Sequence, residues 1–196
     1  MREYYDRRAR EYDDWYLGTG LFADRDRPGW DEEVARLIEV VASLPPGRTL
    51  DVACGTGFLT RHLRGDVVAL DQSRAMLEEA RRNAPRATFL QGDALALPVP
   101  NQSFDRVFTA HFYGHLDEPD RESFLAEARR VAPELVVVDS SRESSEQDEA
   151  HQERLLNDAS RWQVYKRWFS AEGLAAEVGD GETLLAGRWF VAVRAG

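Results

Sequence analysis

The alternation of short apolar runs with longer helical patterns is the feature of this sequence that most constrains its fold. The runs are about five residues long and lack the polar alternation of strands with one face in water, as expected of strands buried on both faces. Such strands, separated by helices of about ten residues, predict right-handed βαβ units and a parallel sheet. We expect strands at 49–53, 66–70, 88–91, 104–109 and 135–138, with helices at 31–43, 59–63, 73–83 and 121–131.

The two ends of the chain are expected to be less regular. Residues 3–16 are predicted to form one aromatic-rich helix, and 140–149 a polar loop that runs into an exposed helix start. We interpret 151–169 as a helix with solvated charges and buried aromatics, and 183–194 as an antiparallel pair that closes the sheet. Asp31, Ser73 and Ser170 are the expected helix N-caps.

Composition limits the protein class. The 196 residues are 43% hydrophobic and 31% charged, which predicts one folded domain. A net charge of −10 argues against a nucleic-acid partner. The sequence has no apolar stretch of about 18 residues and no secretory signal pattern, so we expect no membrane association and a cytoplasmic location. The single cysteine, Cys54, excludes an internal disulfide and a cysteine-cluster metal site, and no metal is expected.

A glycine-rich turn follows the first predicted strand, in the stretch Leu50-Asp-Val-Ala-Cys-Gly-Thr-Gly57. Gly55 and Gly57 allow a sharp turn and leave room for a ligand against the backbone. The segment that follows directs free N–H groups at the same space, which is typical of a nucleotide site. Two glycines at this spacing are weak evidence alone, because ordinary tight turns explain many of them.

Two carboxylates follow the next predicted strands. Asp71 ends the second strand, where a carboxylate can accept two hydrogen bonds from a ribose diol. Asp93 follows the third strand and can accept from an exocyclic amino group such as that of adenine. Either residue alone would commonly be a turn or cap residue. Their recurrence at successive strand ends favours a nucleoside site.

The loop also bears on which nucleoside binds. A dinucleotide fingerprint has a third glycine, but Thr60 occupies that position here and Phe58 directly follows Gly57. Asp51 at the loop's entry disfavours a diphosphate and suits a sulfonium and an ammonium group. This argument favours S-adenosylmethionine over NAD, although Asp51 could simply cap a turn.

The order and spacing of these elements resemble the class I S-adenosylmethionine-dependent methyltransferases of the small-molecule type. The resemblance implies an α/β fold: a single-domain, Rossmann-like, doubly wound sheet of seven mostly parallel strands, the last one antiparallel. It implies one domain over 1–196, with a lid segment at 1–30, a donor-binding core at 48–139 and an acceptor-side portion at 140–196. The resemblance is carried by Tyr5-Asp6 with Tyr12-Asp13, Leu50–Gly57, Val68–Ser73, Gly92-Asp93-Ala94, and Ser103–Asp105 running into Gly114-His115-Leu116.

Carried over by position, the family's donor contacts fall on eleven residues. They are Asp51, Ala53, Gly55 and Gly57 in the loop, Asp71 at the ribose, Gln72, Met76, Asp93 and Ala94 around the adenine, Ala110 near the methionine part, and Tyr12 at the donor carboxylate. Two features depart from the family: Ala53 replaces the first loop glycine, and the turn before the fifth strand is shortened to 132–134.

The acceptor side is less defined. His111 and His115 follow the fourth strand and are candidate general bases, with hydrogen-bonded structural histidines as the alternative and Tyr113 as a weaker candidate. The family often lines the acceptor pocket with the region 151–169. Candidate contacts there are Arg161, Trp162, Tyr165 and Arg167. The short C-terminal part suggests a reduced acceptor pocket or one completed by a second subunit, so a homodimer is one expectation.

Three functions remain open on the sequence. The first is a methyltransferase that acts on a small-molecule acceptor; no Pro-Pro-Tyr/Phe tetrapeptide follows the fourth strand, which disfavours nucleic-acid bases. The second is a protein that binds S-adenosylmethionine without transferring its methyl group. The third is a nucleotide-dependent oxidoreductase, against which Thr60 argues.

Overall fold

A seven-stranded sheet forms the centre of the protein in a computed structural model that describes all residues, Met1–Gly196. The strand order is β3-β2-β1-β4-β5-β9-β8. Strands β1 to β5 pair in parallel, whereas β9 is antiparallel to both of its neighbours. This topology confirms the predicted fold class. The strands are β1 (Gly47–Val52), β2 (Gly65–Asp71), β3 (Thr88–Gln91), β4 (Arg106–Ala110), β5 (Glu134–Ser140), β8 (Glu182–Ala186) and β9 (Phe190–Ala195).

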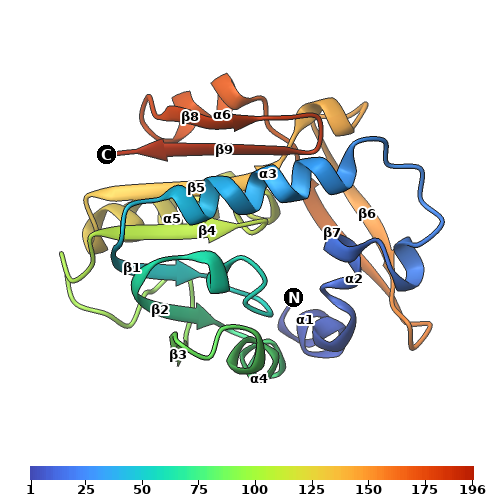
Figure 1. The fold of residues 1–196 in the computed structure, drawn as a ribbon, viewed down its shortest axis with the longest axis horizontal. Helices are drawn as coiled ribbons and strands as arrows, with labels where there is room; N and C mark the ends of the chain where they lie inside the picture. Colours follow the sequence, from blue (N-terminus) through green and yellow to red (C-terminus); the bar gives the residue numbers. More distant parts are fainter.

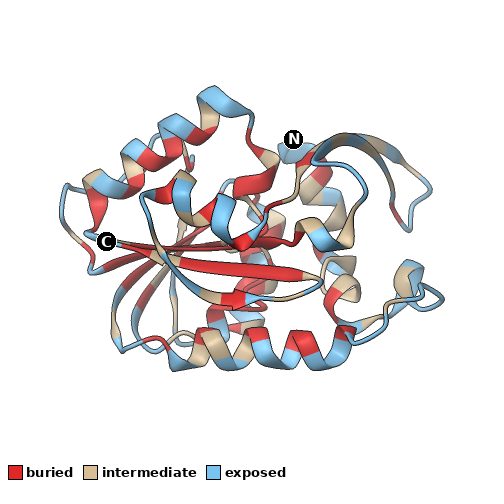
Figure 2. Ribbon diagram, turned by 90° about the horizontal axis from the view of Figure 1, so that it is seen from above, coloured by how far each residue is buried: buried red, intermediate tan, exposed pale blue.

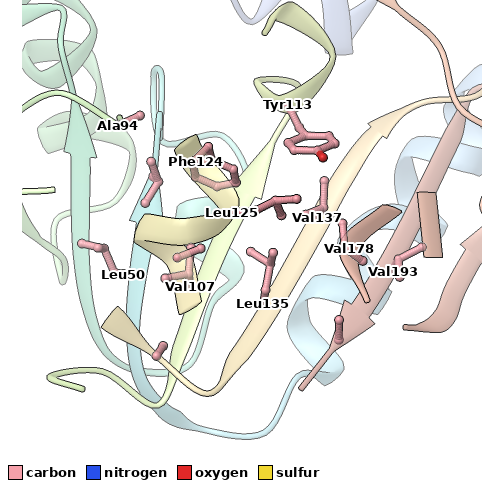
Figure 3. Close-up of a cluster of buried hydrophobic side chains, with 14 of the residues drawn as sticks. Leu50, Ala94, Val107, Tyr113, Phe124, Leu125, Leu135, Val137, Val178 and Val193 are labelled. Carbon is pink, nitrogen blue, oxygen red and sulfur yellow. The ribbon is translucent and has the colours of Figure 1, made fainter. Parts of the chain in front are cut away.

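Helices cover both faces of this sheet (Figures 1 and 2). They are α3 (Trp30–Ser43), α4 (Arg74–Asn83), α5 (Glu118–Val131) and α6 (Ala171–Val178). Successive residues of β5 point to opposite faces: Leu135 and Val137 pack with α5 and α6, as Figure 3 shows, and Val136 packs with α3. Both faces of the valine-rich strand β5 are therefore buried, which explains why its sequence has no polar alternation.

Side-chain capping decides where several helices begin. Ser73 and Ser170 accept hydrogen bonds from the backbone N–H groups of Met76 and Gly173, as predicted. Helix α5 begins earlier than predicted, at Glu118, because Asp117 is its cap. The prediction that Asp31 caps α3 is wrong, since that helix begins at Trp30 after Gly29. The helix predicted at 59–63 is one 3₁₀ turn, η3 (Thr60–His62).

The N-terminal segment is broken rather than one helix over 3–16. It forms α1 (Arg2–Arg8), η1 (Ala9–Glu11) and α2 (Asp14–Leu17), followed by the 3₁₀ turn η2 (Gly20–Phe22). Asp13 lies at the break, and its carboxylate accepts hydrogen bonds from the Asn83 side chain at 3.2 Å and from the Thr56 hydroxyl. These bonds hold the segment against the glycine-rich turn and α4.

The helix predicted over 151–169 is wrong. This region forms an antiparallel pair, β6 (Glu149–Leu155) and β7 (Arg161–Arg167), preceded by the 3₁₀ turn η5 (Arg142–Ser144). Burial alternates with a period of two along β6, so one face packs on the protein while the other meets water. Glu149, Glu153 and Arg161 lie on the outer face of this hairpin, whereas Arg154 and Lys166 lie on its inner face.

The hairpin and the N-terminal segment lie together beside the ends of β2 and β4 in Figure 1. Tyr4 of α1 packs with Leu156 and Val164 in a small apolar cluster. The backbone N–H of Asn157 donates to the Glu11 carboxylate at 2.9 Å. Because strands β1 to β5 end on this side, the space enclosed here borders the predicted site.

None of the helices combines the length and the apolar character that a membrane-spanning helix needs.

Glu33 provides a test of the fold. Its buried carboxylate, on α3, accepts hydrogen bonds from the backbone N–H groups of Arg188, Trp189 and Phe190 at 2.7–3.0 Å. We expect Glu33→Ala to lower the free energy of unfolding by about 2–4 kcal/mol, because hydrogen bonds to a charged group are strong and three donors lose their partner. Urea denaturation measures this loss. Glu32→Ala, at an exposed neighbouring position, is the control; equal losses for both variants would contradict the assignment.

Candidate functional site

A cavity of about 220 Å³ lies at the carboxyl ends of the parallel strands. Nine of the eleven predicted donor residues line it: Tyr12, Ala53, Gly55, Asp71, Gln72, Met76, Asp93, Ala94 and Ala110. They come from the N-terminal segment, from helix α4, and from the ends of four strands and the segments that follow them, and parallel pairing brings those ends to one edge. We call this space the donor cavity.

The turn after β1 is held by Asp71. The Asp71 carboxylate accepts from the backbone N–H of Gly55 at 2.9 Å and from that of Ser73 at 2.8 Å. It thereby joins the glycine-rich turn to the start of α4. Burial raises the pKa of Asp71 to about 6, although the backbone hydrogen bonds oppose the shift.

Gly55 and Ala53 adopt left-handed backbone conformations in this turn, with φ values of 56° and 58°. Glycine adopts such a conformation at little cost, whereas alanine does so at a cost of about 1–2 kcal/mol. A Cβ atom at Gly55 would lie 3.7 Å from the Tyr12 ring, so the turn and the N-terminal segment are in close contact. Tyr12 is itself buried enough to raise its pKa to about 12.

Two predicted donor residues do not line the donor cavity. Gly57 has a φ of 76° and faces α4, where a Cβ atom would lie 3.2 Å from Ala80 Cα, so its role is close packing of the turn on the helix. Asp51 borders a small adjoining hollow and accepts from the Thr60 hydroxyl at 2.6 Å. Burial raises the pKa of Asp51 to about 7. Thr60, in place of a third glycine, is therefore the partner of Asp51.

The other end of the donor cavity has the polarity that a nucleoside requires. Met76 is fully buried beneath it, whereas Asp93 is exposed at its rim and accepts from the backbone N–H of Leu95 at 2.9 Å. The carboxylates of Asp71 and Asp93 are acceptors for a diol and an amino group, and the side chain of Met76 offers an apolar contact for a ring. This donor set fits an adenosine moiety. Leu70, Leu95, Phe112 and Leu116 also line the cavity, and the sequence offered no signal for them.

A second cavity, of about 450 Å³, adjoins the first. Three residues line both spaces: Tyr12, His111 and His115. The rest of its wall comes from the N-terminal segment, the loop before α3, the end of β5 and the β6–β7 hairpin. We call it the acceptor cavity.

His111 occupies the boundary between the cavities in an unusual state. Its φ is 54°, and both ring nitrogens are buried without a hydrogen-bond partner. Its ring packs edge-on against Trp15, with ring centroids 4.8 Å apart. Burial lowers the pKa of His111 to about 3, so the imidazole is neutral at physiological pH. Left-handed backbone and unpaired buried nitrogens are features that commonly mark a site under functional constraint.

His115 is oriented by a backbone carbonyl. Its Nδ1 lies 2.6 Å from the Tyr165 carbonyl oxygen, which can only accept, so Nδ1 carries the proton and Nε2 has the lone pair. Burial and the nearby Lys166 lower the pKa of His115 to about 3. Tyr113, the weaker candidate, is turned away and donates to the Glu177 carboxylate at 2.9 Å.

A buried ion pair lies beside these histidines. Lys166 of β7 pairs with Asp139 of β5, and Asp139 also accepts from the backbone N–H of Gly114 at 2.8 Å. Burial alone would raise the pKa of Asp139, but the positive charge of Lys166 keeps it below the ordinary value. The pair fixes the hairpin to the sheet at the floor of the acceptor cavity.

The predicted acceptor contacts within 151–169 are wrong in detail. Arg161, Trp162, Tyr165 and Arg167 do not line the acceptor cavity, whereas Gln152, Arg154, Lys166 and Trp168 do. The helical interpretation selected the wrong side chains, because in a hairpin alternate residues share a face. Because the inward-facing residues of this hairpin include Gln152, Arg154 and Lys166, the sequence has no apolar alternation that would have identified them.

Comparisons with known proteins agree with this geometry. A family model described as a methyltransferase domain matches residues 49–135. The demethylmenaquinone methyltransferase of Renibacterium salmoninarum is 39% identical over 111 residues, which cover 54% of this chain and 46% of that protein. The malonyl-[acyl-carrier protein] O-methyltransferase of Halorhodospira halophila is 35% identical over 147 residues, covering 70% of this chain and 46% of that protein. The chain thus spans about half the length of these relatives.

Solved structures match nearly the whole chain. The DhpI–SAM–HEP complex has a TM-score of 0.77 at 26% identity, covering 99% of this chain and 94% of that one. The DhpI–SAH complex has a TM-score of 0.75 at 27% identity, covering 99% and 93%. Residues 49–135 match a methyltransferase domain, and together with the relatives and the fold this match supports the assignment of the chain to the class I S-adenosylmethionine-dependent methyltransferases.

Ala53 offers a test of the strained turn. We expect Ala53→Gly to raise the free energy of unfolding by about 0.5–1 kcal/mol, because relief of the left-handed alanine exceeds the entropy that glycine adds to the unfolded chain. Urea denaturation measures the change. Ala126→Gly, at an exposed position inside α5, makes the same chemical change and should instead destabilise by about 1 kcal/mol. A loss of stability in both variants would show that Ala53 is not strained.

The raised pKa of Asp71 predicts pH-dependent donor binding. A ribose diol bound at Asp71 would donate to the charged carboxylate, so binding would favour loss of the proton and the affinity would rise with pH through about 6. We expect calorimetry to show S-adenosylhomocysteine bound about tenfold (about 1.4 kcal/mol) more weakly at pH 5 than at pH 7.5. Asp71→Asn should bind weakly at both pH values. An equal pH dependence in this variant would assign the effect to another group.

Proposed function

We propose that this protein transfers the methyl group of S-adenosylmethionine to a small-molecule acceptor. The observation that carries the proposal is the meeting of two cavities at Tyr12, His111 and His115, one with the donor set for an adenosine moiety and the other free for a second molecule. A transfer between two bound molecules requires such adjoining spaces, since the reacting atoms must lie close and in line.

The residues of the chain would act mainly by positioning. S-adenosylmethionine supplies a methyl group already activated by a positively charged sulfur. Asp71 and Asp93 would hold the nucleoside, and Tyr12 would separate the two molecules from water. The aromatic walls of the acceptor cavity, among them Trp15 and Trp30, lower the local dielectric constant and strengthen the polar contacts made there.

We propose that His111 and His115 contact the acceptor as hydrogen-bond acceptors. Both are neutral, and the Nε2 lone pair of His115 is fixed by the hydrogen bond at Nδ1. A histidine whose pKa is about 3 carries a single ring proton at physiological pH, so one nitrogen of each ring keeps a lone pair that can orient an O–H or N–H group of the acceptor. Both nitrogens of His111 are buried, so its contact requires the side chains around it to shift when the acceptor binds. Their low basicity makes orientation, more than full proton removal, the contribution expected of them.

Donor binding is tested by titrating S-adenosylhomocysteine into the protein. We expect binding, weakened at least tenfold (about 1.4 kcal/mol) in Asp71→Ala, because the variant loses the ribose acceptor. Asp66→Ala, an exposed carboxylate at the opposite end of β2, is the matched control and should bind like the wild type. Binding of NAD instead of S-adenosylhomocysteine would favour the oxidoreductase alternative. Release of labelled methyl product with any acceptor would eliminate the alternative of binding without transfer.

The histidine states are tested by nuclear magnetic resonance. The chain has four histidines, and we expect His111 and His115 to remain neutral down to about pH 5, since their pKa values lie near 3. His111→Gln and His115→Gln assign the two signals. A midpoint near 6.5 for either ring would show that it is solvated and would contradict the proposed role.

A further inference from the structure

The acceptor cavity is positively charged in a protein that is strongly negative. Five cationic side chains line it, Arg8, Arg25, Arg27, Arg154 and Lys166, and Asp26 is the one carboxylate of the wall. Lys166 is already neutralised by Asp139 behind it. The excess positive charge of the cavity therefore resides on four arginines, whereas the whole chain has a net charge of −10.

None of these four arginines has a carboxylate partner within 4 Å, although fourteen ion pairs form elsewhere in the chain. Their partners are neutral. Arg8 donates to the Tyr4 hydroxyl at 2.6 Å, and Arg27 donates to the Trp15 carbonyl at 2.8 Å and lies 3.9 Å over the Trp30 ring. Arg25 is exposed and lies 4.5 Å over the Phe22 ring. None of these contacts compensates the charge of a guanidinium group.

Among the four arginines, Arg154 has a buried guanidinium nitrogen that lacks a hydrogen-bond partner. It is half-buried, its Nε is buried without a hydrogen-bond partner, and its NH2 group donates only to the Gln152 side chain at 2.5 Å. Burial and repulsion by Arg8 lower its pKa. A buried charge without a counter-ion destabilises a protein, so an arrangement of this kind is expected where a ligand supplies the missing charge.

We propose that the methyl acceptor is a small polyanion, a molecule with two or more negative charges on a phosphoryl group or on paired carboxylates, and that Arg154, Arg8 and Arg25 bind it in the acceptor cavity. This inference rests on the proposed function and specifies its substrate class. Guanidinium groups bind both anions by paired, parallel hydrogen bonds, and the tryptophans of the wall strengthen these bonds by excluding water. A cationic acceptor would be repelled by the same residues.

The anchored charges also define where the methyl-accepting atom lies. His111 and His115 border both cavities, whereas the arginines line the acceptor cavity and not the donor cavity. An acceptor held by its anionic end at the arginines would extend its other end, or a further oxygen of the same group, toward the two histidines. The arginines are therefore binding residues, and their loss should change the affinity for the acceptor and leave donor affinity intact.

The test is calorimetric titration of inorganic phosphate, of malonate and of uncharged glycerol into the protein, with and without saturating S-adenosylhomocysteine, at constant ionic strength in chloride. We expect at least one anion to bind and glycerol not to bind. Arg154→Met and Arg25→Gln should weaken that binding at least tenfold and leave the affinity for S-adenosylhomocysteine unchanged. Arg36→Gln, an exposed arginine of α3 outside the cavity, should change neither.

Thermal unfolding separates a ligand role from a structural one. If Arg154 is retained for a ligand, Arg154→Met should leave the melting temperature of the ligand-free protein unchanged or raise it, because the variant removes an uncompensated buried charge. The anion that binds in the titration should raise the melting temperature of the wild type and not that of Arg154→Met.

Each result is decisive. Binding of phosphate alone supports a phosphoryl acceptor, and binding of malonate alone supports paired carboxylates. Binding of neither anion, or equal binding by the wild type and both cavity variants, overturns the inference even where S-adenosylhomocysteine binds. If the anions bind and S-adenosylhomocysteine does not, the polyanion site stands and the methyltransferase proposal fails.

Discussion

Parallel pairing of β1 with both of its neighbours is the constraint on which the rest of the structure depends. Because β2, β1 and β4 run in one direction, the loops that follow them leave the sheet at the same edge. Asp71, at the end of β2, then fixes the turn after β1 through the Gly55 N–H and begins α4 through the Ser73 N–H. One buried carboxylate thereby determines the shape of the donor cavity.

The acceptor side is held together by different interactions, a small apolar cluster and a buried ion pair. Besides the end of β5, it is formed mainly by the N-terminal segment and the β6–β7 hairpin, which lie outside the central sheet and contact each other through Tyr4 and Val164. The Lys166–Asp139 ion pair ties the hairpin to β5. Because the pair is buried, loss of either partner would leave an unpaired charge, which is far more destabilising than loss of both. The hairpin is therefore firmly placed despite its polar sequence.

The donor half of the protein could be predicted from sequence because its signals are local. A valine-rich run, a glycine turn and an acidic strand end each depend on a few adjacent residues, and parallel topology does the rest. Ser73 was identifiable as a cap for the same reason. Asp51 and Gly57 show what sequence cannot predict. The motif placed both residues in the loop, but only the folded structure shows that Asp51 contacts Thr60, that Gly57 packs on Ala80, and that neither lines the donor cavity.

The acceptor half could not be predicted because its elements are defined by partners distant in the chain. In 151–169, a helical period of 3.6 residues and a strand period of two residues predict different sets of inward-facing side chains. The helical interpretation did not select Arg154 and Lys166, which face inward in the β6–β7 hairpin. The missing carboxylate partners of the cavity arginines are also invisible in sequence, where an acidic residue lies within two positions of each arginine. Only the folded arrangement separates paired from unpaired charge.

Tyr12 forms part of the wall of both cavities, and this has a thermodynamic consequence. A ligand that shifts this ring to fit one cavity necessarily reshapes the other. The two binding equilibria are then linked, and by reciprocity whatever factor one ligand imposes on the affinity for its neighbour is returned in full. A single side chain would thus make the affinity of each cavity depend on whether the other is filled.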